Sequence, residues 1–341
     1  MKLNFLAVGD IHLEALARYL PDSNYLSPVI KTLEQIWEYA KDNGIEHVVL
    51  LGDIFDNPYP KDETKKAFLK CLDKKLQYHI ILGNHDFANT YENSLNLCKY
   101  FIEDLGLMDN VKFYLEPTVE EINGVRLNFL PHPYKKATCE APAICFGHFE
   151  TKGSISDSGR PFKDGVVLDK KYTWILGHLH RQQDLVYPGS ICQHKFGEPV
   201  NKYFFDVKVK DNDSVEIEKI NINTPYKLLD LIVNKLEDIN LEKENIYRLY
   251  VADHLDLGEI NKACNGYKVW QIYGLGKNGK SNNQISIDEE DIAYQEENFA
   301  DETVYLKTWL EDHYKEELSK EQIEEIIKLV EKWKSEAKND L

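Results

Sequence analysis

A pattern that occurs five times along the chain constrains it most: a short apolar run ends in glycine, and a residue that can bind a metal ion follows at once. The five junctions are Gly9-Asp10, Gly52-Asp53, Gly83-Asn84, Gly147-His148 and Gly177-His178. Short apolar runs bounded by glycine are typical of buried strands, and ligand sites in layered α/β folds lie beyond the carboxyl ends of such strands. Glycine lacks a Cβ, so the backbone beside each ligand can turn sharply. The sequence therefore predicts five strand ends that converge on one metal site.

The expected ligands include no thiolate. They are Asp10, His12, Asp53, Asn84, His148, His178 and His180. A single tetrahedral ion needs about four ligands, and closed structural zinc sites commonly use cysteine. The set fits two divalent ions that share a bridging carboxylate, and mixed imidazole and oxygen ligation suits manganese, iron or zinc. Two ions about 3.5 to 4 Å apart can bind both the attacking and the leaving oxygen of a displacement at phosphorus. The sequence thus predicts metal-assisted phosphoester hydrolysis.

The forms Asp-x-His, Gly-Asp-x-x-Asp, Gly-Asn-His-Asp, Gly-His and Gly-His-x-His occur in this order across residues 10–180. Together they resemble the five motifs of the calcineurin-like metallophosphoesterases. The resemblance implies two sets of ligands joined by a bridge: Asp10, His12 and His180 on one ion, Asn84, His148 and His178 on the other, and Asp53 on both.

The same resemblance implies roles for His85 and Asp56. His85 would face the scissile phosphate and protonate the leaving oxygen, and Asp56 would orient this histidine, as a carboxylate does in other acid-base sites. The residues alone leave two alternatives open, in which His85 is a third imidazole on the metal ions and Asp56 caps its loop. Asp86 is interpreted as a structural turn acid rather than a catalyst.

Two short segments narrow the substrate class. Tyr187-Pro188-Gly189-Ser190 and Lys195-Phe196-Gly197-Glu198, followed by an expected strand over residues 203–207, resemble the SbcD-type DNA repair nucleases. In length and tail the chain is closest to the nuclease subunits of phage recombination endonucleases, and the resemblance covers residues 1–285. One departure is Glu14, which stands where many relatives have glycine.

This resemblance implies a two-metal DNA exonuclease or endonuclease subunit, with manganese favoured over magnesium, iron or zinc. It implies three partners, namely DNA, an SbcC-type coiled-coil ATPase and a second copy bound through the nuclease domain. The expected processes are DNA replication, recombination and double-strand-break repair. Two other functions stay open: a metallophosphatase or phosphodiesterase for small molecules or phosphoproteins, and a non-catalytic scaffold, against which the complete ligand set and His85 argue.

The net charge of −17 argues at first against DNA binding, because phosphate contacts need lysine and arginine. Residues 281–341 contain 18 acidic and 7 basic side chains, so a charge of −6 remains for residues 1–280. The basic residues considered for DNA contact are Lys61, Lys65, Lys66, Arg160, Lys163 and Arg181. A solvated charged face is the alternative for residues 61–75.

Six cysteines without a Cys-x-x-Cys pair favour a reducing compartment. No apolar run approaches the roughly 20 residues of a membrane span. We therefore expect a cytoplasmic protein without membrane contact, located in the host cytoplasm if a phage encodes it.

The 341 residues, 43% of them hydrophobic, are enough for about two domains. We expect an α/β fold in which residues 1–213 form a two-sheet β-sandwich flanked by helices. A helix with Ser27 as N-cap should end at Asn43-Gly44. Residues 214–285 should form a small α+β capping domain, with strands at 215–222, 246–252 and 267–273 and helices at 225–236 and 258–264.

The C-terminal part is expected to be an acidic linker over residues 286–300 and a helical tail over residues 301–341. The tail carries two amphipathic stripes, which favour docking on a partner over docking on this chain. Residues 274–281 match the phosphate-binding P-loop pattern. An acidic stretch follows in place of a helix, so we interpret this match as a turn without nucleotide binding.

Overall fold

The computed structural model describes residues 1–20, 25–89, 92–104, 106, 108–134, 136 and 142–275. The chain divides into two compact units, Met1–Asn282 and Asn283–Leu341, and all described residues belong to the first. The acidic linker, the helical tail and most of the P-loop-like segment lie outside the described residues. No helix within the described ranges is long and apolar enough to cross a membrane.

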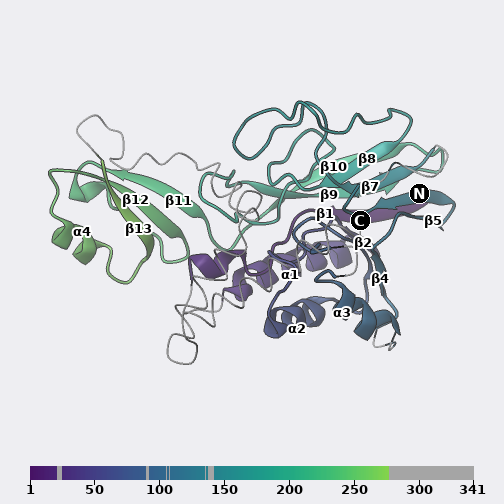
Figure 1. Cartoon of the computed structure of the whole chain (residues 1–341), viewed down its shortest axis with the longest axis horizontal. Coiled ribbons are helices and arrows are strands. Elements are labelled where there is room, and N and C mark those ends of the chain that lie inside the picture. Colours follow the sequence, from purple (N-terminus) through teal and green to yellow (C-terminus); the bar gives the residue numbers. More distant parts are fainter. Residues whose placement is uncertain are drawn as a thin grey trace, which may run out of the picture. The chain divides into compact units, whose positions relative to one another are not determined.

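A six-stranded sheet contains the first three strand ends that were expected to carry ligands (Figure 1). Its strands are β1 (Leu3–Val8), β2 (His47–Leu50), β3 (Gln77–Ile81), β4 (Val111–Tyr114), β9 (Lys202–Val209) and β10 (Val215–Ile222). The order is β10-β9-β1-β2-β3-β4, with β1 to β4 parallel and the pairs β1-β9 and β9-β10 antiparallel. Because β1, β2 and β3 are parallel, their carboxyl ends lie at the same edge.

A second sheet of four strands packs against the first. It contains β5 (Thr118–Ile122), β6 (Val125–Leu130), β7 (Ile144–His148) and β8 (Thr173–Gly177), with β6, β7 and β8 parallel. One buried cluster joins apolar residues of both sheets, and the rings of Phe5 in β1 and Phe146 in β7 are 5.3 Å apart. This confirms the expected two-sheet sandwich.

Helices cover the other face of the six-stranded sheet. They are α1 (Leu26–Asp42) and α2 (Asp62–Cys71), followed by the short α3 (Asn96–Lys99) and the π-turn η2 (Tyr100–Asp104). The indole Nε1 of Trp37 in α1 donates to the carbonyl of Cys71 at the end of α2, at 2.9 Å. The expected helix is therefore present, although Tyr25 rather than Ser27 is its N-cap and makes no side-chain cap.

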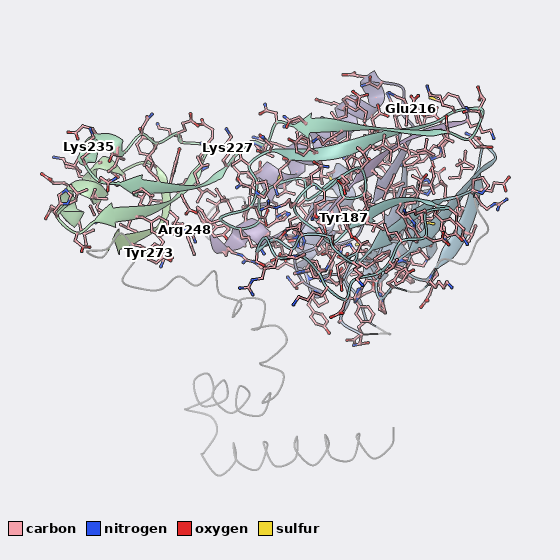
Figure 2. The ribbon with its side chains drawn as sticks, turned by 90° about the horizontal axis from the view of Figure 1, so that it is seen from above. Tyr187, Glu216, Lys227, Lys235, Arg248 and Tyr273 are labelled. Carbon is pink, nitrogen blue, oxygen red and sulfur yellow. The ribbon has the colours of Figure 1, made fainter. Side chains whose placement is uncertain are left out.

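Three parallel strands form a separate small sheet, β11 (Leu228–Val233), β12 (Ile246–Ala252) and β13 (Lys268–Leu275), with α4 (Leu257–Ala263) and the 3₁₀ turn η3 (Leu236–Asp238). Arg248 and Tyr273 mark this sheet in Figure 2. The helix predicted over residues 225–236 is wrong, because residues 228–233 pair with β12 along their length. Short apolar runs do not distinguish a strand from a buried helix by periodicity. The strand expected at 215–222 is β10, which pairs with β9 in the six-stranded sheet.

Candidate metal centre

The five expected strand ends do converge. Asp10, Asp53 and Asn84 follow β1, β2 and β3, His148 is the last residue of β7, and His178 follows β8. Main-chain contacts lock these ends together: the amide of His178 donates to Oδ1 of Asp10 at 2.8 Å, and the amide of His12 donates to the carbonyl of Asp53 at 2.9 Å. The carboxyl ends of both sheets therefore meet at one place.

The backbone at this meeting point is tight and strained. Gly52 has φ +90°, and a Cβ on Gly83 would collide with the main-chain nitrogen and the carboxylate of Asp53. His12, Asp53 and His178 also have positive φ angles of 47°, 48° and 90°. Left-handed conformations are costly for residues with a side chain and occur most often at functional sites. Glycine thus permits the close approach, and the ligand candidates take on the remaining strain.

Asp10, His12 and His180 form a first group, in which ligand-capable atoms lie within 4.8 Å of one another. The Nε2 atoms of His12 and His180 face each other at 3.1 Å. The Oδ2 atom of Asp10 is buried and has no hydrogen-bond partner. A buried carboxylate oxygen without a donor is costly unless a cation compensates it.

Asp53, Asn84, His148 and His178 form a second group. The Oδ1 atom of Asn84 lies 2.8 Å from His148 Nε2 and 2.8 Å from His178 Nδ1. The Oδ2 atom of Asp53 lies 3.2 Å from His148 Nε2 and 3.4 Å from His12 Nε2. Asp53 therefore stands between the two groups, where a bridging carboxylate would be.

A main-chain carbonyl behind His148 decides which of its two ring nitrogens faces the candidate metal centre. The Nδ1 atom of His148 lies 2.7 Å from the carbonyl oxygen of Leu51, and a carbonyl can only accept. His148 therefore keeps its Nδ1 proton on Leu51 and turns Nε2 toward Asn84 and Asp53. Metal-binding histidines in proteins are usually held in this way. The donor set and the buried, unpartnered oxygen of Asp10 fit two divalent cations.

Neighbouring charges counteract the effect of burial on the pKa values of Asp53 and His148. Burial would raise the pKa of Asp53, but His148, His12 and His85 hold it well below its usual value. Burial would lower the pKa of His148, but Asp53 raises it to about 9. The pKa of His178 falls to about 4, because burial and the neighbouring His148 both disfavour its charge. Asp53 is thus held as a carboxylate, the form that binds a metal ion.

The comparison with known families agrees with this geometry. Residues 3–208, more than half of the chain, match the family model described as calcineurin-like phosphoesterase. The chain belongs to this family. It is a metal-dependent phosphoesterase, and the family resemblance stated from the sequence is confirmed.

Two viral relatives are similar to this phosphoesterase. The putative phosphoesterase 078R of Invertebrate iridescent virus 3 is 26% identical over 288 residues, which cover 75% of this chain and 78% of the relative. Exonuclease subunit 1 of Enterobacteria phage T4 is 29% identical over 195 residues, 52% of this chain and 55% of the relative. The match thus spans about half the length of the phage protein.

Among solved structures, two uncharacterised proteins align with parts of this phosphoesterase. A protein of unknown function from Aquifex aeolicus has a TM-score of 0.23 and 17% identity over 37% of this chain and 59% of its own. A hypothetical protein from Thermus thermophilus has a TM-score of 0.31 and 12% identity over 64% of this chain and 100% of its own.

His85 lies beside Asp53, the candidate bridging carboxylate. Its amide donates to Oδ1 of Asp53 at 2.8 Å, and its ring lies 4.6 Å from the ring of His12. Its Nδ1 is 3.0 Å from the main-chain carbonyl of Asp56, so Nδ1 carries the proton and Nε2 is free. The carboxylate of Asp56 instead lies 3.3 Å from His12 Nδ1 and accepts from Arg18 at 3.3 Å.

Two acidic residues of the phosphoesterase are structural. The carboxylate of Asp86 is fully buried and accepts from the amides of Ile54, Phe55 and Gly83 and from the hydroxyl of Ser94. Asp86 thereby joins the loops that follow β2 and β3. Glu14 accepts from the amide of Lys61, from Asn57 and from the hydroxyl of Thr64, so it braces the start of α2.

Sequence reasoning missed residues of the segment between Ser190 and Lys202. Glu198 and Lys202 are buried, and Glu198 contacts the candidate ligand His180 at 2.9 Å. His194 is buried with both ring nitrogens unpartnered, and its ring lies 4.7 Å from that of His12. The Phe-Gly-Glu sequence marked this segment, but nothing in its spacing related it to the metal ligands.

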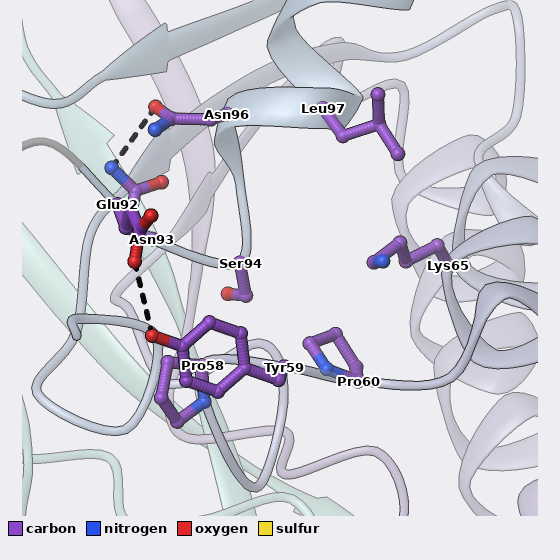
Figure 3. A pocket seen from close by; sticks show the side chains of 9 residues that line it. All are labelled: Pro58, Tyr59, Pro60, Lys65, Glu92, Asn93, Ser94, Asn96 and Leu97. Carbon is purple, nitrogen blue, oxygen red and sulfur yellow. Dashed lines mark hydrogen bonds between the residues drawn. The ribbon is translucent and has the colours of Figure 1, made fainter.

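A hollow of about 300 Å³ opens beside the loops that follow Asp56 and Asp86 (Figure 3). Its lining residues are Pro58, Tyr59, Pro60, Lys65, Glu92, Asn93, Ser94, Asn96 and Leu97. Ser94 in its wall bonds Asp86 at 2.8 Å, and the hydroxyl of Tyr59 donates to Glu92 at 3.1 Å. The hollow is therefore built on the loops that position His85.

Proposed function

We propose that this phosphoesterase is a two-metal-dependent DNA nuclease subunit. The observation that carries the proposal is the similarity over 195 residues to a phage protein named as an exonuclease subunit. The family match over residues 3–208, which include the candidate metal centre, supports it. The geometry supports phosphoester hydrolysis, because Oδ2 of Asp53 lies between His12 of one ligand group and His148 of the other. Two cations in that arrangement can bind both oxygens of an in-line displacement at phosphorus.

The ligand roles follow the two groups. Asp10, His12 and His180 would hold one ion, Asn84, His148 and His178 the other, and Asp53 both. When bound, the ions supply Lewis acidity and a strong nucleophile at neutral pH. Manganese is the metal we propose.

His85 is the proposed general acid. Because its Nδ1 proton is directed to the carbonyl of Asp56, its Nε2 is free to carry the proton that the leaving oxygen receives. The Asp56 carbonyl holds the ring at Nδ1, and the bond from the main-chain amide of His85 to Asp53 holds its backbone. A general acid must be fixed within hydrogen-bond reach of the leaving atom. We propose Asp56 as the residue that fixes it, through its main chain.

The proposed partners are DNA, an SbcC-type coiled-coil ATPase and a second copy of this chain, in DNA recombination and double-strand-break repair. We propose boundaries at residues 285 and 300, with the tail as the ATPase-binding part. The boundary expected at residue 213 does not fit the sheets, because β10 pairs with β9 in the six-stranded sheet and the small sheet begins only at β11. Four exposed apolar residues near the hollow support a second copy at this surface: Tyr59, Leu97, Tyr100 and Phe101. Exposed apolar patches often mark protein interfaces.

Two of the lysines considered for DNA contact already bind partners within the chain. Lys61 donates to the hydroxyl of Tyr25 at 3.3 Å, and Lys65 pairs with Asp62 at 3.2 Å. Such surface pairs contribute little and are screened by salt, so both lysines can exchange these partners for phosphate.

The test is a cleavage assay with Mn²⁺ or Mg²⁺ on single- and double-stranded DNA, run beside nucleotide monoesters and an activated phosphodiester. We expect metal-dependent DNA cleavage that chelation abolishes. Hydrolysis of monoesters or of the activated diester without DNA cleavage would instead assign the chain to the small-molecule or phosphoprotein phosphoesterases. Bound metal with no hydrolysis of any of these would favour a scaffold.

A further inference from the structure

A chain of buried hydrogen bonds leads away from the first ligand group. The Nδ1 atom of His180 lies 2.9 Å from Oε1 of Glu198, and Oε2 of Glu198 accepts from Nζ of Lys202 at 2.9 Å. Side chains of both Glu198 and Lys202 are only 1% exposed. A buried carboxylate and a buried ammonium are each strongly unfavourable unless they are paired. Such a pair next to a metal ligand therefore points to a role at that ligand.

The geometry decides which ring nitrogen of a neutral His180 carries the proton. A carboxylate can only accept, so the contact with Glu198 places the proton of a neutral His180 on Nδ1 and leaves Nε2 free. Nε2 is the atom that faces His12 Nε2 at 3.1 Å, within the first ligand group. Carboxylate–histidine–metal arrangements of this kind orient the ring and increase the basicity of the ligand.

Lys202 holds Glu198 in place from strand β9. Its Nζ also donates to the hydroxyl of Ser190 at 2.7 Å and to the carbonyl of His180 at 3.4 Å. Oε2 of Glu198 accepts in addition from the main-chain amide of His194 at 3.2 Å. Both oxygens of the Glu198 carboxylate thus have hydrogen-bond partners, which fix its orientation.

The segment that carries Glu198 is held from the opposite side by the small sheet. The side-chain amide of Gln193 accepts from the main-chain amide of Leu228 at 2.9 Å and donates to its carbonyl at 3.2 Å. It also donates to the carbonyl of Glu198 at 2.9 Å. The ring of Phe196 stacks on Trp270 of β13 at 5.5 Å. The position of Glu198 therefore depends on both the sandwich and the small sheet.

We propose that Glu198, fixed by Lys202, is a positioning residue of the metal centre: it holds His180 in the tautomer and orientation that bind the ion of the Asp10, His12 and His180 group. The proposal concerns metal binding alone, so it is independent of which phosphoester the chain cleaves. A second carboxylate must be considered, because Oδ2 of Asp157 lies 3.2 Å from His180 Nδ1. Its side chain is 19% exposed and also pairs with Lys195, so it is the weaker constraint.

The test is metal titration of the full chain by calorimetry with Mn²⁺, together with absorption spectra after Co²⁺ substitution. Glu198→Gln alone leaves a buried lysine without its counter-charge and can fail to fold, since breaking a buried ion pair is strongly destabilising. The main variant is therefore Glu198→Gln with Lys202→Met, which removes both charges. We expect it to fold, to bind one of two ions about 10- to 100-fold more weakly, and to change the Co²⁺ bands of that site only.

Two controls separate positioning from general damage. Asp206→Asn removes another buried carboxylate, which binds Tyr39 and Lys208 away from the ligands, and should leave both affinities unchanged. Asp157→Asn should weaken metal binding less than the double variant does. Wild-type affinity for both ions in a folded Glu198→Gln/Lys202→Met variant would overturn the proposal, and so would a larger loss in Asp157→Asn, which would assign the role to Asp157.

Discussion

The Nδ1 atom of His85 lies 3.0 Å from the main-chain carbonyl oxygen of Asp56, while the carboxylate of Asp56 is directed at His12 Nδ1, 3.3 Å away. One residue thus contacts the proposed general acid through its main chain and a candidate metal ligand through its side chain. A substitution of the Asp56 side chain and a substitution of His85 should therefore have different consequences.

Replacement of His85 should lower the rate of cleavage without loss of bound metal. We expect His85→Ala to reduce cleavage by ~10²- to 10⁴-fold, the usual cost of losing one general acid, while about two ions per chain remain bound. Steady-state rates and metal analysis on the same sample are the measurements. Near-normal turnover would contradict the assignment, and loss of one ion would show that His85 is a metal ligand.

Replacement of Asp56 should act through the metal. In Asp56→Asn the main-chain carbonyl still orients His85, but His12 loses its anionic partner, so we expect about 10- to 100-fold weaker binding of one ion. Saturating Mn²⁺ should then restore most of the activity. Activity that stays low at saturating metal would show that the carboxylate acts on His85 directly.

Acid should destabilise the sandwich through His79. Burial, followed by the charges of His47 and Lys112, lowers the pKa of His79 to about 3. Because its folded pKa lies below the unfolded value of about 6.5, its contribution to stability is complete above that value and is lost as pH falls toward 3. The free energy of unfolding should fall by about 1.4 kcal/mol per pH unit for this one group.

His79→Phe, which preserves the stack with Phe129, should remove this part of the slope. Urea unfolding of both proteins between pH 7.5 and 5 measures the difference, expected at roughly 2 kcal/mol. His254→Phe, at an exposed position, is the matched control and should keep the wild-type slope. Equal slopes for His79→Phe and wild type would contradict the prediction.

Removal of residues 300–341 tests the proposed tail. The metal centre is built entirely within the first unit, so the truncated chain should fold, bind metal and cleave DNA slowly. It should lose the ATPase, because an amphipathic helix binds by burying its apolar stripe in a partner's groove. Pull-down and a thermal melt are the measurements. Undiminished ATPase binding, or a large fall in Tm, would show that the tail docks on its own chain.

The sequence by itself determined which residues converge. The ligand candidates follow glycine at strand ends, so they converge if β1, β2, β3, β7 and β8 are parallel within their sheets. Short apolar runs bounded by glycine predict that arrangement. The sandwich and the family followed from the same pattern. The helix expected at residues 225–236 failed, because pairing of β11 with β12 outweighed local preference.

Only the tertiary structure decided the outer contacts of the site. Glu198 is 18 residues from His180 in the chain, and nothing in that spacing indicates the 2.9 Å bond between them. The same holds for the main-chain contact between Asp56 and His85. The strand pattern predicts which face of a sheet a side chain lies on, because successive side chains of a strand point to opposite faces. Its partner depends on rotamers and on packing between distant segments, so the orientation of each ligand appears only when the sheets are assembled.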